Sequence, residues 1–278
     1  MADINRSNIA LPADVSAEII QKTQDASAVM SFARRVTLPG RGVAIPVITG
    51  DPDAEWVAET GKKPVSNSTL STKILQPYKL AVIETFSKEF VRDAKALYDA
   101  LVARLPLALA QKFDATVFGN VTAPGSNFDT LGAVTAQSLG SDAYAALVAA
   151  DTDIASNGGI VNGWVIAPQG KGKLLGTVDT TGRPLFINNV ADGGIPQILG
   201  ASTKVAKAAY KDDTVDTLGF VGDWTQAIYG TVEGVQISIS DQATVGEINL
   251  WEQNMVAVRA EIEIGFRADT SVFNKITE

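Results

Sequence analysis

The sequence predicts an α+β fold whose two lobes exchange segments that are distant along the chain. Three patterns support this: residues 34–87 contain several strand-like runs, leucines recur at four-residue steps through residues 97–109, and residues 256–266 alternate strictly between two faces. The chain has 278 residues, of which 46% are hydrophobic, so it can bury a substantial core. Because the alternating strand returns after a mixed α/β region, we expect interleaved rather than successive lobes.

The first expected element is an exposed N-terminal arm of residues 1–29. Within it, Asp14 is placed to cap a short helix that carries Val15 and Ile19 at near-helical spacing. The arm holds more acidic than basic side chains, so it has no basic tract that could bind nucleic acid.

Strand-like runs follow the arm. Residues 34–39 and 42–48 form two short runs separated by the turn dipeptide Pro39-Gly40, and residues 69–75 and 79–85 form two more. The simplest arrangement is a long two-stranded excursion whose tip lies within residues 50–67. An isolated hairpin is marginally stable in water, so we expect this one to lie on a neighbouring subunit.

The expected tip is rich in charge and contains a tryptophan. Glu55, Glu59, Lys62 and Lys63 surround Trp56. A solvated loop is one interpretation, and an interface that pairs with opposite charges on a neighbour is the other. Trp56 favours the interface, because exposing a large aromatic side chain is unfavourable unless it docks.

Helical spacing begins after residue 87. We expect a helix over residues 93–118, with Pro106 either kinking it or beginning its second half, and Gly119 ending it. If continuous, this helix would span roughly 40 Å at about 1.5 Å per residue. Further along we expect helices at 141–155 and 171–175, a turn at 192–194, and strands at 164–167, 205–209, 220–221, 226–229 and 235–239.

The returning strand is the clearest pattern in the chain. Even-numbered residues from Val256 to Phe266 are apolar, whereas Arg259, Glu261 and Glu263 lie on the opposite face. We therefore expect one face against a core and one charged face toward solvent or a partner.

Composition and motifs give little sign of catalysis. The chain contains no Cys and no His, which removes cysteine chemistry, His-based acid–base catalysis and the commonest transition-metal ligands. Residues 170–173, Gly-Lys-Gly-Lys, match no phosphate-loop pattern, and Asp142, Asp151 and Asp153 lack calcium-loop spacing. No motif for an active site remains, so we expect no enzyme, no cofactor and no metal. The net charge of −8 gives no overall attraction for nucleic acid, and the sequence has no signal-peptide or membrane-span pattern.

The order of these segments resembles the major capsid protein family of tailed bacteriophages, with the HK97-like fold. The resemblance rests on residues 54–59, on residues 79–82, on Phe118-Gly119 after the long helix, on residues 164–168 before residues 182–186, and on residues 222–224 and 227–230 before the alternating strand. It covers nearly the whole chain, from about residue 28 to residue 277.

The resemblance implies a part for each segment. Residues 1–29 would be the N-terminal arm and residues 30–125 the peripheral P-domain, with an E-loop at about 42–75 and a spine helix at about 93–118. Residues 126–240 would be the axial A-domain, residues 241–266 the P-domain return strand, and residues 267–278 a tail at the A-domain. Some relatives crosslink an E-loop lysine; Lys62 and Lys63 lie in that loop, but no partner Asn or assisting Glu can be placed.

The resemblance also implies function and partners. Copies of the chain would form pentamers and hexamers that close into an icosahedral virion capsid around double-stranded DNA, without sequence-specific binding and without a membrane. We expect assembly in the host bacterial cytoplasm, with portal and decoration proteins as further partners and a separate scaffold protein, since the chain reaches the arm at once. Two alternatives stay open: an encapsulin-like compartment shell with the same fold, and a carboxylate or oxygen-ligand metal enzyme.

Overall fold

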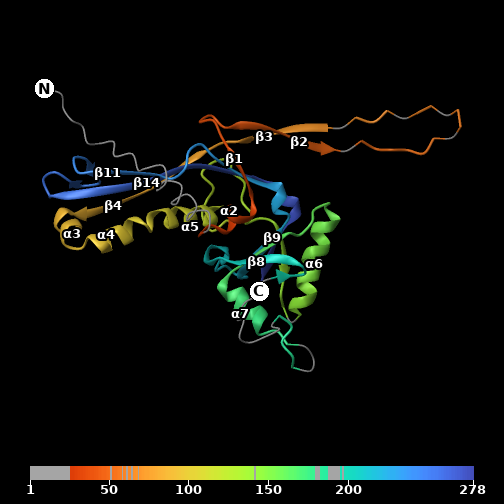
Figure 1. The fold of residues 1–278 in the computed structure, drawn as a ribbon. Helices are drawn as coiled ribbons and strands as arrows, with labels where there is room; N and C mark the ends of the chain where they lie inside the picture. The colour runs from red at the N-terminus through yellow and green to blue at the C-terminus, as the bar shows by residue number, and fades with distance from the viewer. Residues whose placement is uncertain are drawn as a thin grey trace.

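The structure is a computed structural model that describes residues 26–278, apart from residues 51, 58, 61, 64, 68, 141, 179–181, 187–194 and 196. The short helix expected after Asp14, most of the expected arm and the expected turn at 192–194 lie outside the described residues. Within the described chain, an elongated lobe, a second lobe and a projecting hairpin meet near the middle of the molecule (Figure 1).

Two large sheets organise the described residues. The elongated lobe has a five-stranded sheet in the order β1-β10-β14-β11, with β4 also paired to β14. Its strands are β1 (Arg34–Thr37), β4 (Tyr78–Ser87), β10 (Ala227–Thr231), β11 (Gln236–Ser240) and β14 (Met255–Ala268). The second lobe has a six-stranded sheet in the order β5-β15-β9-β6-β8-β7. These strands are β5 (Thr135–Ser138), β6 (Gly163–Ile166), β7 (Gln197–Ile198), β8 (Ala201–Val205), β9 (Thr217–Gly222) and β15 (Phe273–Thr277).

The strand β14 is the axis of the elongated lobe. It pairs antiparallel with β4 along one edge and with β11 and then β10 along the other. The predicted alternation is confirmed, because Val258, Ala260, Ile262, Ile264 and Phe266 are buried. Near the C-terminal end of the strand, the ring of Phe266 lies 6.2 Å from the ring of Phe113 on helix α5 (Leu105–Val117).

The long helix expected at residues 93–118 is divided. Its place is taken by α3 (Lys88–Asp93), α4 (Lys95–Val102) and α5, with the α4–α5 break at Ala103 and Arg104. Pro106 lies in the first turn of α5, where its missing N–H leaves no helical hydrogen bond unmade. Of the two roles considered for Pro106, the structure therefore shows the beginning of a second half.

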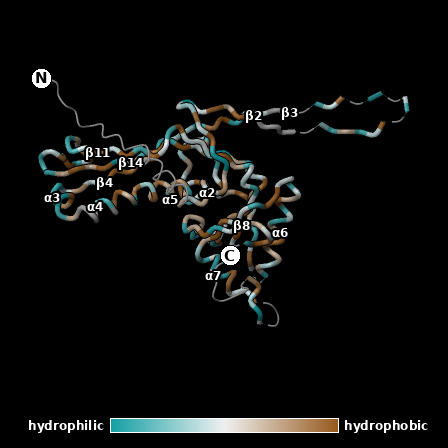
Figure 2. The backbone as a smooth tube through the Cα atoms, in the orientation of Figure 1, coloured by the Kyte–Doolittle hydropathy of each residue, from teal (hydrophilic) through white to brown (hydrophobic). Residues whose placement is uncertain are grey.

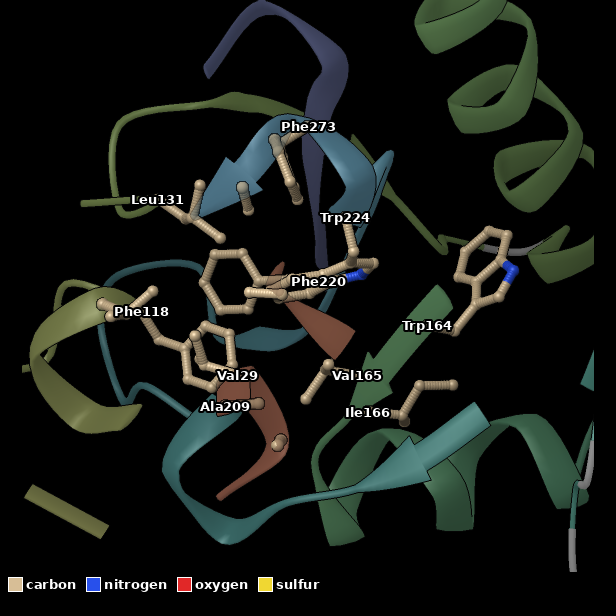
Figure 3. Packing of buried hydrophobic residues seen from close by; sticks show 14 of the residues in the cluster. Val29, Phe118, Leu131, Trp164, Val165, Ile166, Ala209, Phe220, Trp224 and Phe273 are labelled. Atoms are coloured by element: carbon tan, nitrogen blue, oxygen red, sulfur yellow. The ribbon is translucent and has the colours of Figure 1, made fainter. Parts of the chain in front are cut away.

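The core of the second lobe is aromatic (Figure 3). The rings of Phe118 and Phe220 stack at 4.7 Å, and the rings of Trp224 and Phe273 meet edge to face at 5.2 Å. The indole Nε1–H of Trp224 donates to the carbonyl oxygen of Gly163 at 3.0 Å. Helices α6 (Ala143–Ser156) and α7 (Pro168–Leu175) pack on this sheet, and both confirm the sequence prediction.

One predicted strand in this lobe is wrong. The strand expected at residues 205–209 ends at Val205, and residues 207–209 form the 3₁₀ turn η1. The Nδ2 group of Asn120, just beyond α5, donates to the carbonyl oxygens of Ala208 and Tyr210, which holds the turn against that helix. This tertiary contact overrides the local strand pattern.

The remaining described elements are short or project from the body. They are α2 (Ala28–Phe32), β2 (Val43–Gly50), β3 (Thr69–Leu75), η2 (Trp224–Gln226), β12 (Thr244–Val245), β13 (Ile248–Asn249) and η3 (Thr270–Val272). The strands β10 and β11 lie within the sequence range expected for the A-domain but pair with β14 in the elongated lobe.

Candidate inter-subunit surfaces

The β2–β3 hairpin carries the residues predicted to form an interface. Its strands pair from Val43 opposite Leu75 to Gly50 opposite Thr69, and the chain between them forms the tip. The tip points away from both lobes, and hydrophobic and hydrophilic segments follow one another along the hairpin (Figure 2). Every described tip residue predicted to matter, namely Glu55, Trp56, Glu59, Lys62 and Lys63, is exposed.

The tip exposes large apolar side chains. Trp56 has 104% relative exposure and Val65 has 86%, so neither side chain is covered by its own chain. A backbone–side-chain contact joins the two sides of the tip, because the Asp53 N–H donates to the Ser66 hydroxyl at 2.8 Å. An exposed tryptophan with apolar and charged neighbours has the composition of an interface anchor.

The root of the hairpin is held by Arg267, near the end of β14. Its Nε donates to the carbonyl oxygen of Ile74 at 2.8 Å, and its two terminal nitrogens donate to Asp129 Oδ1 at 2.7 Å and Asn127 Oδ1 at 2.8 Å. The side chains of Arg267 and Asp129 are only 12% and 21% exposed, so water screens this ion pair weakly. One guanidinium thus links β3, β14 and the loop after α5.

Close backbone packing supports the same root. Leu75 is fully buried, and a Cβ at Gly42 would overlap the carbonyl oxygen of Leu75. Gly42 also has a φ of 81°, which favours glycine. On the body side, a Cβ at Gly265 would overlap the carbonyl oxygen of Gln76. The hairpin is therefore a projecting unit with a firmly packed base.

The predicted charged face of the returning strand is present, but much of its charge is paired within the chain. Lys79 Nζ lies 3.3 Å from Glu263 Oε1, and Arg259 Nε lies 3.4 Å from Glu261 Oε2. Arg259 is exposed, whereas Glu261 and Glu263 are half-buried. Ile83, opposite Arg259 on β4, is also exposed on this part of the sheet.

A buried carboxylate anchors the start of the described chain. Asp114 on α5 is 2% exposed and accepts hydrogen bonds from the Ser27 hydroxyl at 2.5 Å and from the Ala28 N–H at 2.7 Å. Burial raises the pKa of Asp114 to about 6, although these hydrogen bonds and the charge of Lys204 act in the opposite direction. Asp114 therefore fixes the N-terminus of α2 to α5.

The weak chemical motifs have structural roles. Residues 170–173 lie inside α7, where Lys173 pairs with Glu278 at 2.8 Å. Asp142 caps α6 by accepting from the Ala145 N–H, and Asp153 accepts from Asn274. The part of the chain that the structure describes contains no cluster of three or more His, Cys, Asp or Glu side chains that could hold a metal ion. Similarly, the described helices include none long and apolar enough for a membrane span.

Sequence reasoning missed the Arg267 contacts and the Asp114 anchor. Arg267 continues the polar face of the alternating strand, so its pattern looks like that of Arg259. Asp114 is an acidic residue beside the apolar stripe of its helix, and this position could have indicated a buried carboxylate. The partners of both residues come from distant segments that periodicity cannot identify.

Comparisons with known proteins agree with this architecture. A model of the phage capsid family matches residues 8–271. A protein of Mycobacterium phage D29, described as probable major capsid protein gp17, is 28% identical over 92% of this chain and 86% of its own length. A solved structure from Mycobacterium phage Bobi has a TM-score of 0.77 at 21% identity, with 90% of each chain covered. A capsid chain of an empty GTA particle, computed with C5 symmetry, has a TM-score of 0.68 at 15% identity over 91% of this chain and 89% of its own.

The family match covers most of the chain, and the structural likeness extends over both lobes and fits the HK97-like capsid fold. The chain belongs to the phage capsid family.

Proposed function

We propose that this chain is the major capsid subunit of a tailed phage, and that its copies assemble through pentamers and hexamers into an icosahedral shell around double-stranded DNA. The observation that carries the proposal is the projecting hairpin, whose tip exposes Trp56 completely. A two-stranded excursion without a core beneath it gains stability when it lies on another molecule. In a shell of identical subunits, that molecule is a second copy.

The family's division of labour suits the two lobes. We propose the elongated lobe as the P-domain, with α3, α4 and α5 as a segmented spine and the β2–β3 hairpin as the E-loop. The lobe built on β6, β9 and β15 would be the A-domain. We adjust the expected boundaries in one respect: β10 and β11 pair with β14, so residues 227–240 join the P-domain.

The proposed contact residues follow from this division. At the tip, Trp56 would enter an apolar site on the neighbour, while Glu55, Glu59, Lys62 and Lys63 would pair with charges around it. On the P-domain strand, Arg259, Glu261 and Glu263 would contribute a polar surface to a neighbour. Because two ion pairs already satisfy much of this surface within the chain, we expect the tip to contribute more binding energy.

In this proposal the subunit encloses DNA and catalyses no reaction. The net charge of −8 gives no overall attraction for nucleic acid, so the shell would enclose DNA without sequence-specific binding, and packaging would need other proteins. Portal, scaffold and decoration proteins are the proposed further partners, and assembly would take place in the host cytoplasm before the subunit becomes part of the virion. The encapsulin-like alternative is not favoured, because the matching family and relatives are those of phages.

A shortened hairpin tests the proposal. Gly50 pairs with Thr69, so residues 51–68 can be replaced by Asn-Gly, a two-residue turn suited to hairpins. We expect the variant to keep the melting temperature of the unassembled subunit but to form no shells in negative-stain electron microscopy and light scattering. Shells of normal size and yield from this variant would contradict the role of the tip.

A further inference from the structure

The helix α2 contacts both lobes. Ser27, the residue that caps its start, donates its hydroxyl hydrogen to Oδ1 of Asp114 on α5, in the elongated lobe. The carbonyl oxygen of Ser27 accepts from Nζ of Lys204 on β8, in the second lobe, at 3.1 Å. At the other end of α2, the ring of Phe32 stacks on the ring of Trp224 at 5.6 Å. This helix of five residues therefore joins elements of both lobes.

The hydrogen bonds at the start of α2 converge on one carboxylate. Oδ2 of Asp114 accepts from the Ala28 N–H at 2.7 Å, and Oδ1 accepts from the Ser27 hydroxyl and from the Val29 N–H. Asp114 is 2% exposed, and Ser27 and Ala28 are completely buried. Because all three donors belong to residues 27–29, undocking of α2 would remove them from the carboxylate and open it to water.

The helix α2 depends on its docked position. A helix of five residues is too short to persist by itself in water, because nucleation costs more than so few hydrogen bonds return. Its residues Ala28, Val29 and Met30 are buried, and Val29 belongs to the core drawn in Figure 3. We therefore expect this segment to fold and dock in one step, with a docked helix and an undocked chain as its two states.

Few charges surround Asp114. The helix α2 has no ionisable side chain, and Lys204 is the charged group whose attraction acts on the carboxylate. Lys207, on the neighbouring turn η1, is exposed. The strands β4 and β14 also pack on α5, and their charged residues are the half-buried Glu84 and the members of three ion pairs, namely Lys79 with Glu263, Arg259 with Glu261, and Arg267 with Asp129.

Burial has the largest effect on Asp114. It raises the pKa of the docked carboxyl to about 6, against the opposite effects of the three hydrogen bonds and of Lys204. With α2 undocked, water would reach Asp114, and its pKa would return toward the ordinary value of 3.8. Docking of α2 and protonation of Asp114 are therefore linked, and each favours the other.

We propose that α2 is a latch between the two lobes, held closed when Asp114 carries a proton and opened more readily when Asp114 is ionised. The cause is the cost of burying a charge, which the docked helix imposes and the undocked chain relieves. Closure is favoured most below about pH 4 and weakens as the pH rises through 6. The latch is a property of the single subunit and does not depend on the proposed function.

Hydrogen exchange of the unassembled subunit tests the latch. The N–H groups of Ala28, Val29, Met30 and Ala33 all donate hydrogen bonds when α2 is docked, so peptides covering residues 27–33 report its opening. After correction for the intrinsic pH dependence of exchange, we expect the opening constant to rise about fiftyfold from pH 4 to pH 7. At pH 7 these amides should exchange faster than the amides of β9, because α2 opens while the second lobe stays folded.

Three variants separate the charge of Asp114 from the fold. Asp114→Asn removes the titrating group, so its opening constant should stay within about twofold over this range. Lys204→Met removes the attraction that lowers the pKa of Asp114, so the change should move to higher pH. Lys207→Met replaces an exposed lysine nearby and should follow the wild type as the matched control. Melting temperatures check that each variant is folded.

Several results would overturn the latch. Equal protection of the α2 and β9 amides at pH 7 would mean that α2 leaves the body only when the whole subunit unfolds. The same pH profile in the wild type and in Asp114→Asn would mean that Asp114 does not control opening. An equal displacement of the profile in Lys204→Met and Lys207→Met would assign the effect to general surface charge.

Discussion

The hairpin and the second lobe use apolar residues in opposite ways. Every residue of β6 and β9 is buried, and Trp224 is 1% exposed with its indole nitrogen hydrogen-bonded. In the hairpin, by contrast, Trp56 is 104% exposed, and Val43 and Ile74 keep 38% and 45% of their surface exposed. The lobe thus completes its core within one chain, whereas the hairpin has apolar surface that only another molecule can cover. From this difference we expect folding and assembly to depend on separate parts of the same subunit.

The largest expected effect comes from disrupting the buried core of the second lobe. Trp224→Ala removes a buried ring that packs on Phe32 and Phe273. We expect it to lower the free energy of unfolding by about 3–5 kcal/mol. Chemical denaturation of the unassembled subunit measures this loss, and a change of less than about 1 kcal/mol would show that the second lobe does not dominate stability.

A pH-dependent effect follows from the buried carboxylate that joins α2 to α5. The folded-state pKa of Asp114 is about 6, above its ordinary value of 3.8, so folding favours the protonated form. Its contribution to stability is therefore present below pH 4 and lost as the pH rises through 6. Relative to Asp114→Asn, the wild type should gain up to about 3 kcal/mol between pH 7 and pH 4.

Denaturation of both proteins across this pH range measures the difference. A constant difference between the wild type and Asp114→Asn across the range would contradict the raised pKa.

Replacing Trp56 tests whether the exposed tip contributes to assembly and not to folding. Trp56→Ala should change the free energy of unfolding by less than about 0.5 kcal/mol, because the side chain has no intramolecular packing to lose. As an interface anchor, it should weaken each contact by about 2 kcal/mol, or roughly thirtyfold in binding constant. Light scattering across subunit concentrations measures assembly, and normal shells at wild-type concentrations would remove Trp56 as an anchor.

The last comparison concerns the base of the hairpin, and it sets two arginines of β14 against each other. Arg267→Ala leaves Asp129 and the Ile74 carbonyl without their donor and should cost about 1–3 kcal/mol. Arg259→Ala breaks a more exposed pair and should cost less than about 1 kcal/mol.

The junction also predicts a change in geometry. Because the chain has no Cys, spin labels can be attached specifically to cysteines introduced at Val65 and Ala149. We expect Arg267→Ala to broaden the distance distribution between these labels, and Arg259→Ala to leave it narrow. Equal distributions in the two variants would mean that Arg267 does not orient the hairpin.

Sequence patterns predicted the elements whose signal lies within a short stretch of chain. The alternation from Val256 to Phe266, the four-residue leucine spacing and the turn signals around the hairpin all correspond to observed elements. The division of the long helix was only one of two options, because Pro106 is compatible with a kink and with a helix start. The strand expected at 205–209 was wrong, because Asn120, a distant residue, holds part of that segment as a turn.

By itself, the sequence determined the α+β class, the hairpin with its exposed charged tip and Trp56, and the two faces of the returning strand, because periodicity and turn chemistry act between neighbours in the chain. Tertiary structure alone decided which lobe each strand joins and how Arg267 and Asp114 find their partners. These depend on register and on contacts between distant segments, such as the 193 residues that separate Ile74 from Arg267, which no local pattern encodes.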